Sequence, residues 1–395
     1  MKFDNLTKIK LVYFFKSLFF FSPIITLFYF SRGLDTFQVV SLEAILIISV
    51  LLMEVPTGII ADKIGRKYSL SILTFFYVIG NIWTIYAHSY REFIFIEILF
   101  GIGIAFGSGA IEALVYDSLK YQKKERTMGK VWGSINSYAL VAGVFAVTLG
   151  GYLARSHDSD SFVLLLWLYT IGAVIAFIIS LFVTERKHEK DIVRKSPLLL
   201  FKESTVHILE NKSLRRIILL SVFTLPFTHV ILFLFQPYFL MANVNNALFG
   251  VAMAIGSVLG FFLMKYAYKI ERRFGVSKTM FVATILPGLL YLVMAFFIGP
   301  WLSFTWYVLQ KGFMKIRWPL FSQYQNTHIK SYNRATVLSV ISMIVSLYLG
   351  IMRLVLGKIA NYDLITSFVV MGVIIVVGAI AFRINEGHVN GSESG

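Results

Sequence analysis

Charged side chains interrupt long apolar segments of this chain, and their signs differ between its two halves. The first half holds carboxylates inside or at the edge of such segments: Glu43, Glu54, Glu97 and Glu112. The second half holds basic groups: His229, Lys311, Lys315, Arg317 and Arg353. An ionisable group inside a bilayer costs about 2.5–3.5 kcal/mol on insertion scales and by default marks a transport or proton pathway. Both sets are therefore candidates for function.

The carboxylates suit proton exchange, because a carboxylate in apolar surroundings favours its neutral form. Glu97, Ser108 and Glu112 are spaced so that they share broadly one helix face. The proton-coupling candidates are Glu54, Glu97, Glu112 and His229, whose imidazole titrates near neutral pH. Alternatives remain open: Glu54 is solvated, Glu97 is an interfacial residue paired with a nearby Lys or Arg, and His229 only hydrogen-bonds within the helix packing.

The cations near position 315 suit binding of an anionic or zwitterionic molecule. Lys311 and Lys315 are four residues apart and share a helix face, and aromatic residues surround them. The substrate-binding candidates are Glu112, Lys311, Lys315 and Arg317. In the alternative, Lys315 and Arg317 snorkel to the membrane interface; Lys311 is too deep for that. Arg353 lies towards the outer end of its segment, where a snorkelling anchor is one interpretation.

Apolar helices must position these groups. Of 395 residues, 57% are hydrophobic and only 15% charged, with a mean hydropathy of +0.74, whereas soluble domains are about one-quarter charged. Runs of about 20 apolar residues, enough to cross a bilayer, recur along the chain. Pro226 predicts a kink in the seventh of them. We expect an all-α membrane protein with twelve transmembrane helices in two six-helix bundles, over residues 9–31, 38–57, 68–87, 92–116, 131–154, 162–183, 216–240, 247–268, 278–298, 302–322, 335–358 and 363–383.

The net charge of +16 follows the same topology. Lys and Arg concentrate at the N-terminus and in alternate connecting segments, and the other connectors hold few: Arg32, Arg91, Arg155 and Lys358. This is the positive-inside pattern, which favours a multi-pass protein of the plasma (inner) membrane with both termini cytoplasmic. It argues against a nucleic-acid patch. The first apolar run is too long for a signal peptide, and the absence of Cys excludes thiol chemistry.

Polar stretches divide the chain. We expect an N-terminal bundle over 1–184, a cytoplasmic linker over 185–213, a C-terminal bundle over 214–385 and a tail over 386–395 that is partly an expression remnant. Residues 198–209 have apolar residues at roughly helical spacing. They are interpreted as linker, with a helix on the membrane surface as the alternative.

The stretch from Gly58 to Lys67 resembles the signature G-x-x-x-D-x-x-G-R-[KR] of the major facilitator superfamily, a loop between the second and third helices. Every defining position matches, and Gly58 and Gly65 permit close helix approach and a tight turn. The resemblance implies the major facilitator fold, alternating access, and a latch of Asp62, Arg66 and Asp117. The gating motif is Gly58, Asp62, Gly65, Arg66, Lys67 and Asp117.

Two departures from the family pattern bear on activity. Glu97 occupies the position of an Arg that the family associates with proton coupling. The segment 142–151 resembles an antiporter signature and keeps Gly150 and Gly151, but has Val147 in place of its Pro. The resemblance implies proton-coupled export of a small organic molecule, as in bacterial drug and metabolite efflux members. Uptake of an anionic nutrient, a lipid flippase and a non-transporting sensor are the alternatives.

The sequence contains no nucleotide-binding loop, metal-ligand cluster or nucleophile constellation. We therefore expect no enzyme and no metal or other cofactor, with a proton gradient as the energy source. The expected partners are a small-molecule substrate, protons and the lipid bilayer. We expect a monomer and no nucleic-acid partner.

Overall fold

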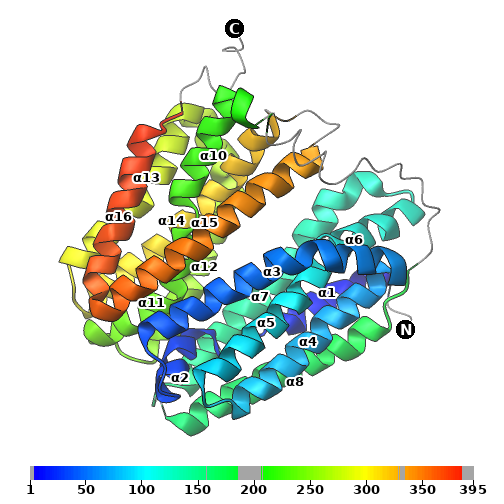
Figure 1. The fold of residues 1–395 in the computed structure, drawn as a ribbon, viewed down its shortest axis with the longest axis horizontal. Helices are drawn as coiled ribbons and strands as arrows, with labels where there is room; N and C mark the ends of the chain where they lie inside the picture. Colours follow the sequence, from blue (N-terminus) through cyan, green and yellow to red (C-terminus); the bar gives the residue numbers. More distant parts are fainter. Residues whose placement is uncertain are drawn as a thin grey trace. The chain divides into compact units, whose positions relative to one another are not determined.

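The protein is helical throughout the part that the computed structural model describes, which is residues 4–156, 158–185, 206, 208–327, 329 and 334–384. Figure 1 shows the helices in chain order. The first ten elements are α1 (Asn5–Lys16), η1 (Ser22–Ile24), α2 (Ile25–Ser31), α3 (Thr36–Ile64), α4 (Arg66–Tyr86), α5 (Tyr90–Gly107), α6 (Ala110–Tyr121), η2 (Glu125–Thr127), α7 (Met128–Leu153) and α8 (Ser159–Leu181). The later ones are α10 (Lys212–Thr224), α11 (Phe227–Met241), α12 (Leu248–Phe274), α13 (Val276–Phe296), α14 (Pro300–Thr327), α15 (Arg334–Tyr362) and α16 (Leu364–Ala381).

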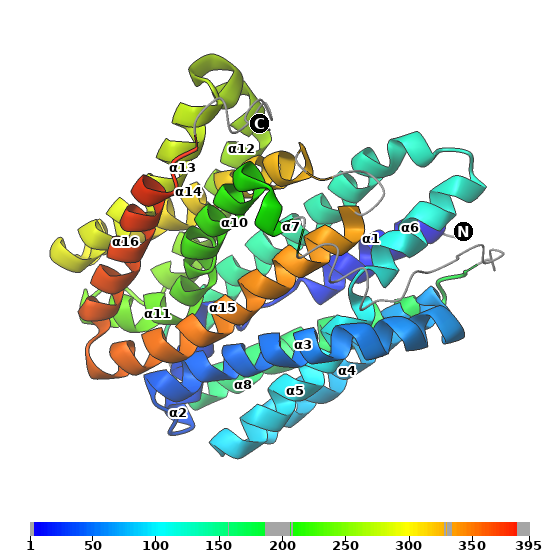
Figure 2. The ribbon, with the colours of Figure 1, turned by 45° about the horizontal axis from the view of Figure 1, so that its top comes forward.

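The chain divides into two compact units. Unit 1 comprises 1–189 with 245–254, and unit 2 comprises 190–244 with 255–395. In unit 1, α5 packs against α3 and α4, α4 against α8, and α1 against α7 and α8; Figure 2 shows α3, α4, α5 and α8 side by side. In unit 2, α13 packs against α14 and α16, and α10 against α14 and α16. Most of the predicted linker and all of the predicted tail lie outside the described residues.

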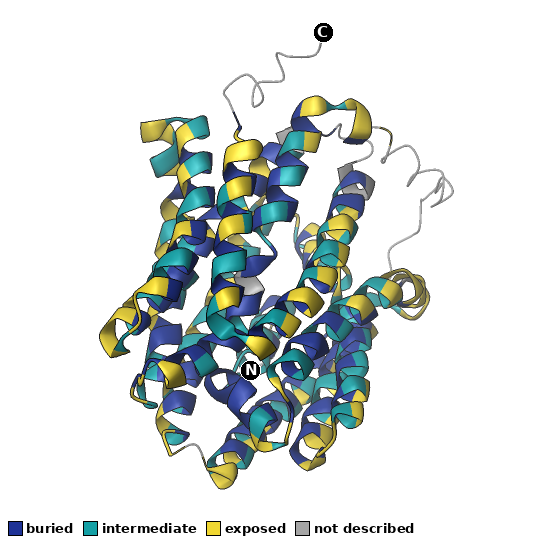
Figure 3. Ribbon diagram, turned by 60° about the vertical axis from the view of Figure 1, so that its left-hand side comes forward, coloured by how far each residue is buried: buried dark blue, intermediate teal, exposed yellow. Residues whose placement is uncertain are grey.

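Each of the twelve predicted segments is helical, and nine described helices are long and apolar enough to cross a membrane. Exposed residues, yellow in Figure 3, occur along the helices. Large apolar residues are among them, including Leu52, Phe145 and Trp301. Exposed apolar surface of this extent is what a lipid environment accommodates. Polar caps mark where helices begin: Asp35 and Ser89 each form a capping box at the start of α3 and α5.

Three of the predicted helices are interrupted. The first divides into α1 and α2, the fourth into α5 and α6, and the seventh into α10 and α11. Gly109, with φ +69°, breaks the fourth. The predicted kink at Pro226 is confirmed, because α10 ends at Thr224 and α11 begins at Phe227.

Glycines pack closely against the backbone at the end of α1 and in the segment that follows it. A Cβ at Gly150 of α7 would clash with the Phe20 carbonyl, and one at Gly172 of α8 would lie 2.9 Å from the Phe15 carbonyl. Non-helical backbone at membrane depth is tolerated only where protein or water surrounds it. These glycines allow α7 and α8 to enclose the interruption.

Candidate functional site

The predicted gating motif is a sharp corner between two helices rather than a loop. Residues 58–64 continue α3, and Gly65 alone separates α3 from α4. Its φ of +110° lies in a region that glycine adopts readily. The close helix approach expected at Gly58 is not seen, since among the described residues no atom lies within 4 Å of the place a Cβ would occupy.

The first residue of α4 forms an ion pair with α6: Arg66 Nη1 contacts Asp117 Oδ2, and the side chains are 34% and 22% exposed. The contact that the sequence predicted between Arg66 and Asp117 is therefore present. Their role in gating stays a prediction. The side chain of Asp62, the third member of the proposed latch, lies outside the described part of the structure.

A carboxylate that sequence reasoning missed completes this corner. Glu185 Oε2 accepts a 3.0 Å hydrogen bond from the Lys67 N–H, at the N-terminus of α4 where the helix dipole favours an anion. A Cβ at Gly65 would lie 2.7 Å from the same oxygen. One feature of the sequence could have indicated this carboxylate: Glu185 is an acidic residue directly after an apolar segment.

Glu97 is buried in unit 1, where the Tyr29 hydroxyl donates a 3.3 Å hydrogen bond to its Oε1. Tyr29 belongs to α2 and Glu97 to α5. Glu43 of α3 is a further neighbour of Tyr29 and of Tyr77 on α4. Four helices thus bring two carboxylates and two phenols close together in the apolar interior of the unit.

Glu54 and Glu112 lie near the break in the fourth helix. The Ser108 hydroxyl donates a 3.0 Å hydrogen bond to Glu54 Oε1, and Glu112 is exposed in the first turn of α6. The predicted common face of Glu97 and Glu112 is wrong, because the positive φ of Gly109 ends α5 before α6 begins.

Lys16 is the last residue of α1, where the negative end of the helix dipole favours a cation. Its Nζ lies 5.3 Å from the ring centre of Tyr13 and 5.5 Å from that of Tyr77. This is cation–π geometry. Lys16 is an exception to the division of charge between the two halves of the chain.

In unit 2, Lys311 and Lys315 of α14 share one face and pack along glycines of α12. A Cβ at Gly256 would lie 3.0 Å from Lys311 Cβ, and one at Gly260 would lie 2.8 Å from Lys315 Cγ. The Lys311 ammonium lies 5.9 Å from the Tyr307 ring centre, and Lys315 is exposed. The glycines make room for the lysine stems.

Arg317 does not join the two lysines. At 100° per residue it lies about 120° around α14 from Lys311 and about 160° from Lys315. It is fully buried, and its Nη1 donates a 2.9 Å hydrogen bond to the Thr224 carbonyl of α10. Arg353 of α15 is also buried. Neither arginine snorkels to an interface. The side chain of His229 lies outside the described residues.

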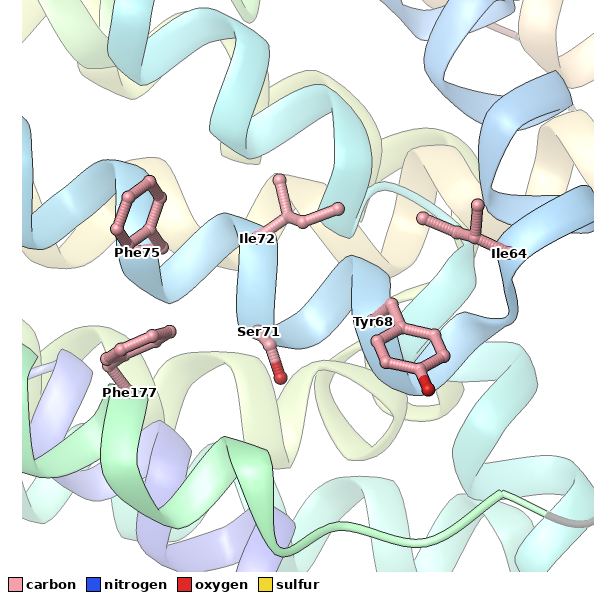
Figure 4. A pocket seen from close by; sticks show the side chains of 6 residues that line it. All are labelled: Ile64, Tyr68, Ser71, Ile72, Phe75 and Phe177. Atoms are coloured by element: carbon pink, nitrogen blue, oxygen red, sulfur yellow. The ribbon is translucent and has the colours of Figure 1, made fainter.

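A groove of ≈ 450 Å³ lies on unit 1 and contains none of the predicted site residues. Its lining comes from the end of α3, from α4 and from α8 (Figure 4): Ile64, Tyr68, Ser71, Ile72, Phe75 and Phe177. The lining side chains are apolar apart from the hydroxyls of Tyr68 and Ser71. They lack the charged groups that would orient a polar substrate.

Interrupted apolar helices with ionisable groups in their interior are the architecture of polytopic membrane transporters. The family model of the Major Facilitator Superfamily matches residues 11–309. The chain belongs to this family of transporters.

Known proteins support the same architecture. The uncharacterized MFS-type transporter YxaM of Bacillus subtilis (strain 168) is 22% identical over 372 residues, which cover 92% of this chain and 91% of that relative. Among solved structures, a mutant of the nucleoside transporter NupG has a TM-score of 0.82 at 14% identity, covering 96% of this chain and 99% of that one. A D-xylose–proton symporter has a TM-score of 0.75 at 15% identity, covering 96% and 97%. At these identities the structures show the fold alone.

Proposed function

We propose that this protein couples proton movement to the export of a small organic molecule that is anionic or zwitterionic. The observation that carries the proposal is the separation of charge between the units. Unit 1 holds the buried Glu97 with its Tyr29 hydrogen bond, and unit 2 presents Lys311 and Lys315 on one face of α14. A buried carboxylate suits proton exchange, and paired ammonium groups suit an anion.

The other candidate residues take the following roles in this proposal. Glu54, Glu112 and His229 are further proton-coupling groups, and Glu112 also contacts a positive group of the substrate. Arg66 and Asp117, with Asp62, Gly65 and Lys67, bias the two states of alternating access. The energy source is the proton gradient, without a cofactor. The protein is a monomer of the plasma membrane with both termini in the cytoplasm.

The test is substrate-induced proton flux in liposomes that contain purified protein and a pH-sensitive dye. The panel comprises cationic drugs, zwitterionic metabolites and organic anions. We expect proton movement with anions or zwitterions. Glu97→Gln and Glu112→Gln should abolish that movement, and Lys311→Gln should abolish binding of the anion. Glu125→Gln, on the short helix η2, is the control. Flux only with cationic drugs, or unchanged flux in both carboxylate variants, would sink the proposal.

Proton-driven uptake is the second candidate. It is favoured by the lysine pair, which suits capture of a nutrient anion, and by the structural likeness to a D-xylose–proton symporter. Right-side-out and everted membrane vesicles under the same proton gradient separate the two directions. Accumulation of substrate in everted vesicles acidified inside supports export by exchange. Accumulation in right-side-out vesicles with an inward proton gradient supports uptake instead.

A further inference from the structure

The interruption between α10 and α11 contains a proline, which removes one helical hydrogen-bond donor. Leu225 and Pro226 separate the two helices. Because proline has no N–H, position 226 cannot donate to the Val222 carbonyl one turn earlier. An unpaired carbonyl in apolar surroundings is costly, so other groups must serve this part of the chain.

Two buried side chains from two other helices donate to carbonyls on either side of the interruption. Arg317 Nη1 of α14 donates to Thr224 O, the last residue of α10, at 2.9 Å. The Tyr291 hydroxyl of α13 donates to Phe227 O, the first residue of α11, at 2.7 Å. Thr224, Phe227, Tyr291 and Arg317 are each 0% exposed. The interruption is therefore held from both sides by specific donors.

Arg317 brings more donors than this arrangement uses. Its Nε and Nη2 are buried and have no hydrogen-bond partner among the described residues. Gln310, two turns earlier on the same face and beside Tyr291, likewise has amide atoms without a hydrogen bond of good geometry. A neutral donor would serve one carbonyl at a lower desolvation cost than a guanidinium. A guanidinium has five N–H groups, so it can donate to one carbonyl in one conformational state and to another carbonyl in the next.

We propose that Arg317 is a positioning residue for a joint in the seventh helix. In the state described here it donates to Thr224 O, and when α10 and α11 change their angle it donates to Val222 O, which Pro226 leaves without a helical donor. Tyr291 holds the α11 side of the joint. Transport then depends on Arg317 through the geometry of α10 and α11, and Arg317 touches no substrate.

The first test is a double-mutant cycle on the melting temperature of the purified protein. Pro226→Ala restores an N–H and allows the helix to continue, so it should lessen the need for Arg317. We expect Arg317→Met to lower the melting temperature about twice as far in the wild type as in the Pro226→Ala background, the non-additivity typical of residues that share partners. Equal losses in both backgrounds would overturn the proposal.

Milder variants keep the cycle informative where Arg317→Met does not fold. Tyr291→Phe removes one hydroxyl from the joint and should also be non-additive with Pro226→Ala. Tyr238→Phe is the matched control, because its buried hydroxyl donates to the Met294 carbonyl at 2.9 Å and away from the interruption. We expect additive effects for Tyr238→Phe. If the effects of Tyr291→Phe and Pro226→Ala add as fully as those of the control, Tyr291 and Pro226 are not coupled and the proposed joint is overturned.

The functional consequence rests on the proposed transport and is tested separately. In Arg317→Lys we expect substrate affinity within about twofold of wild type and a transport rate lowered by about tenfold, the pattern of a residue that acts after binding. Weakened affinity with an intact rate would make Arg317 a substrate ligand and overturn the inference. If the wild type moves no substrate at all, the proposed function fails, and the stability cycle still decides whether the joint exists.

Discussion

Arg66 at the start of α4 and Asp117 on α6 form an ion pair across the corner of unit 1. Both side chains are partly exposed, and exposed pairs stabilise a fold by only about 0.2–1 kcal/mol. The pair therefore adds little to the stability of unit 1. We infer that its value lies in biasing the equilibrium between conformational states, for which a few tenths of a kcal/mol are sufficient to change populations.

Neutralising one member of this pair should separate transport from stability. We expect Asp117→Asn to change the transport rate severalfold while shifting the melting temperature by at most about 4 °C. Flux in liposomes and thermal melts of the same preparation provide both values. The exchange of charges in Arg66→Asp with Asp117→Arg should restore part of the rate. A normal rate in Asp117→Asn would contradict a gating role.

The two glycines of the motif should respond differently to alanine. Gly65 has φ +110° and faces the Glu185 carboxylate, so we expect Gly65→Ala to destabilise by about 1–3 kcal/mol. Gly58 is helical with open space around it, so Gly58→Ala should be neutral or stabilise by up to about 1 kcal/mol. Thermal unfolding in detergent measures both. Equal effects would show that the corner is not what requires glycine.

The glycines of α12 should influence substrate binding through the lysines. In Gly260→Ala the new methyl group meets the Lys315 stem at 2.8 Å, which displaces the ammonium group. We expect affinity for an anionic substrate to fall about three- to tenfold, since this corresponds to about 0.7–1.4 kcal/mol. Equilibrium binding measures it, and Gly129→Ala is the control because its Cβ would meet nothing within 4 Å. Equal affinity in both variants would remove Lys315 from the site.

The cap of α8 should make stability depend on pH in the acid range. The Asp158 carboxylate accepts hydrogen bonds from the Ser156 hydroxyl and the Ser161 N–H, which lower its pKa from 3.8 to about 2. A lowered pKa in the folded state stabilises the protein above the unfolded value, and the contribution is lost as pH falls from 3.8 to about 2.

We therefore expect Asp158→Ala to melt below wild type at neutral pH, with the difference shrinking as the pH drops under 3.8. Melting curves across the acid range measure this convergence. Asp160→Ala is the control, since Asp160 is exposed two residues later and lacks the capping bonds. A difference that stays constant down to the lowest pH would mean that the ionised cap is not the cause.

Hydropathy predicted the helical segments well because a bilayer demands about 20 apolar residues whatever their packing. It did not reveal the interruptions after Lys16 and at Gly109: the first depends on the helices that enclose it, and the second on the positive φ of Gly109. Gly150 and Gly172 permit the first break, and they stand over a hundred residues away in sequence. Pro226 was the exception, because the missing N–H is a local property.

The candidate site was predicted in part for similar reasons. The resemblance to the family motif predicted that Arg66 meets Asp117, and the structure contains this contact. Lys311, Lys315 and Arg317 were grouped by closeness in sequence, but the helical angle between them assigns Arg317 to a different face. Only the structure shows Thr224 as its partner. The pairing of Glu97 with Tyr29 joins α5 to α2, and no spacing along the chain indicates it.

The divided first helix has a consequence for how the chain enters the membrane. Its two helices comprise 12 and 7 residues, each short of the roughly 20 needed to span a bilayer alone, and Lys16 lies where they are interrupted. The translocon selects segments by their own hydrophobicity, and the charge of Lys16 in the middle of this segment weakens that signal. We expect the segment to become stably transmembrane only after α7 and α8 have been synthesised. Unit 1 would then assemble late in synthesis, with these three segments inserting together.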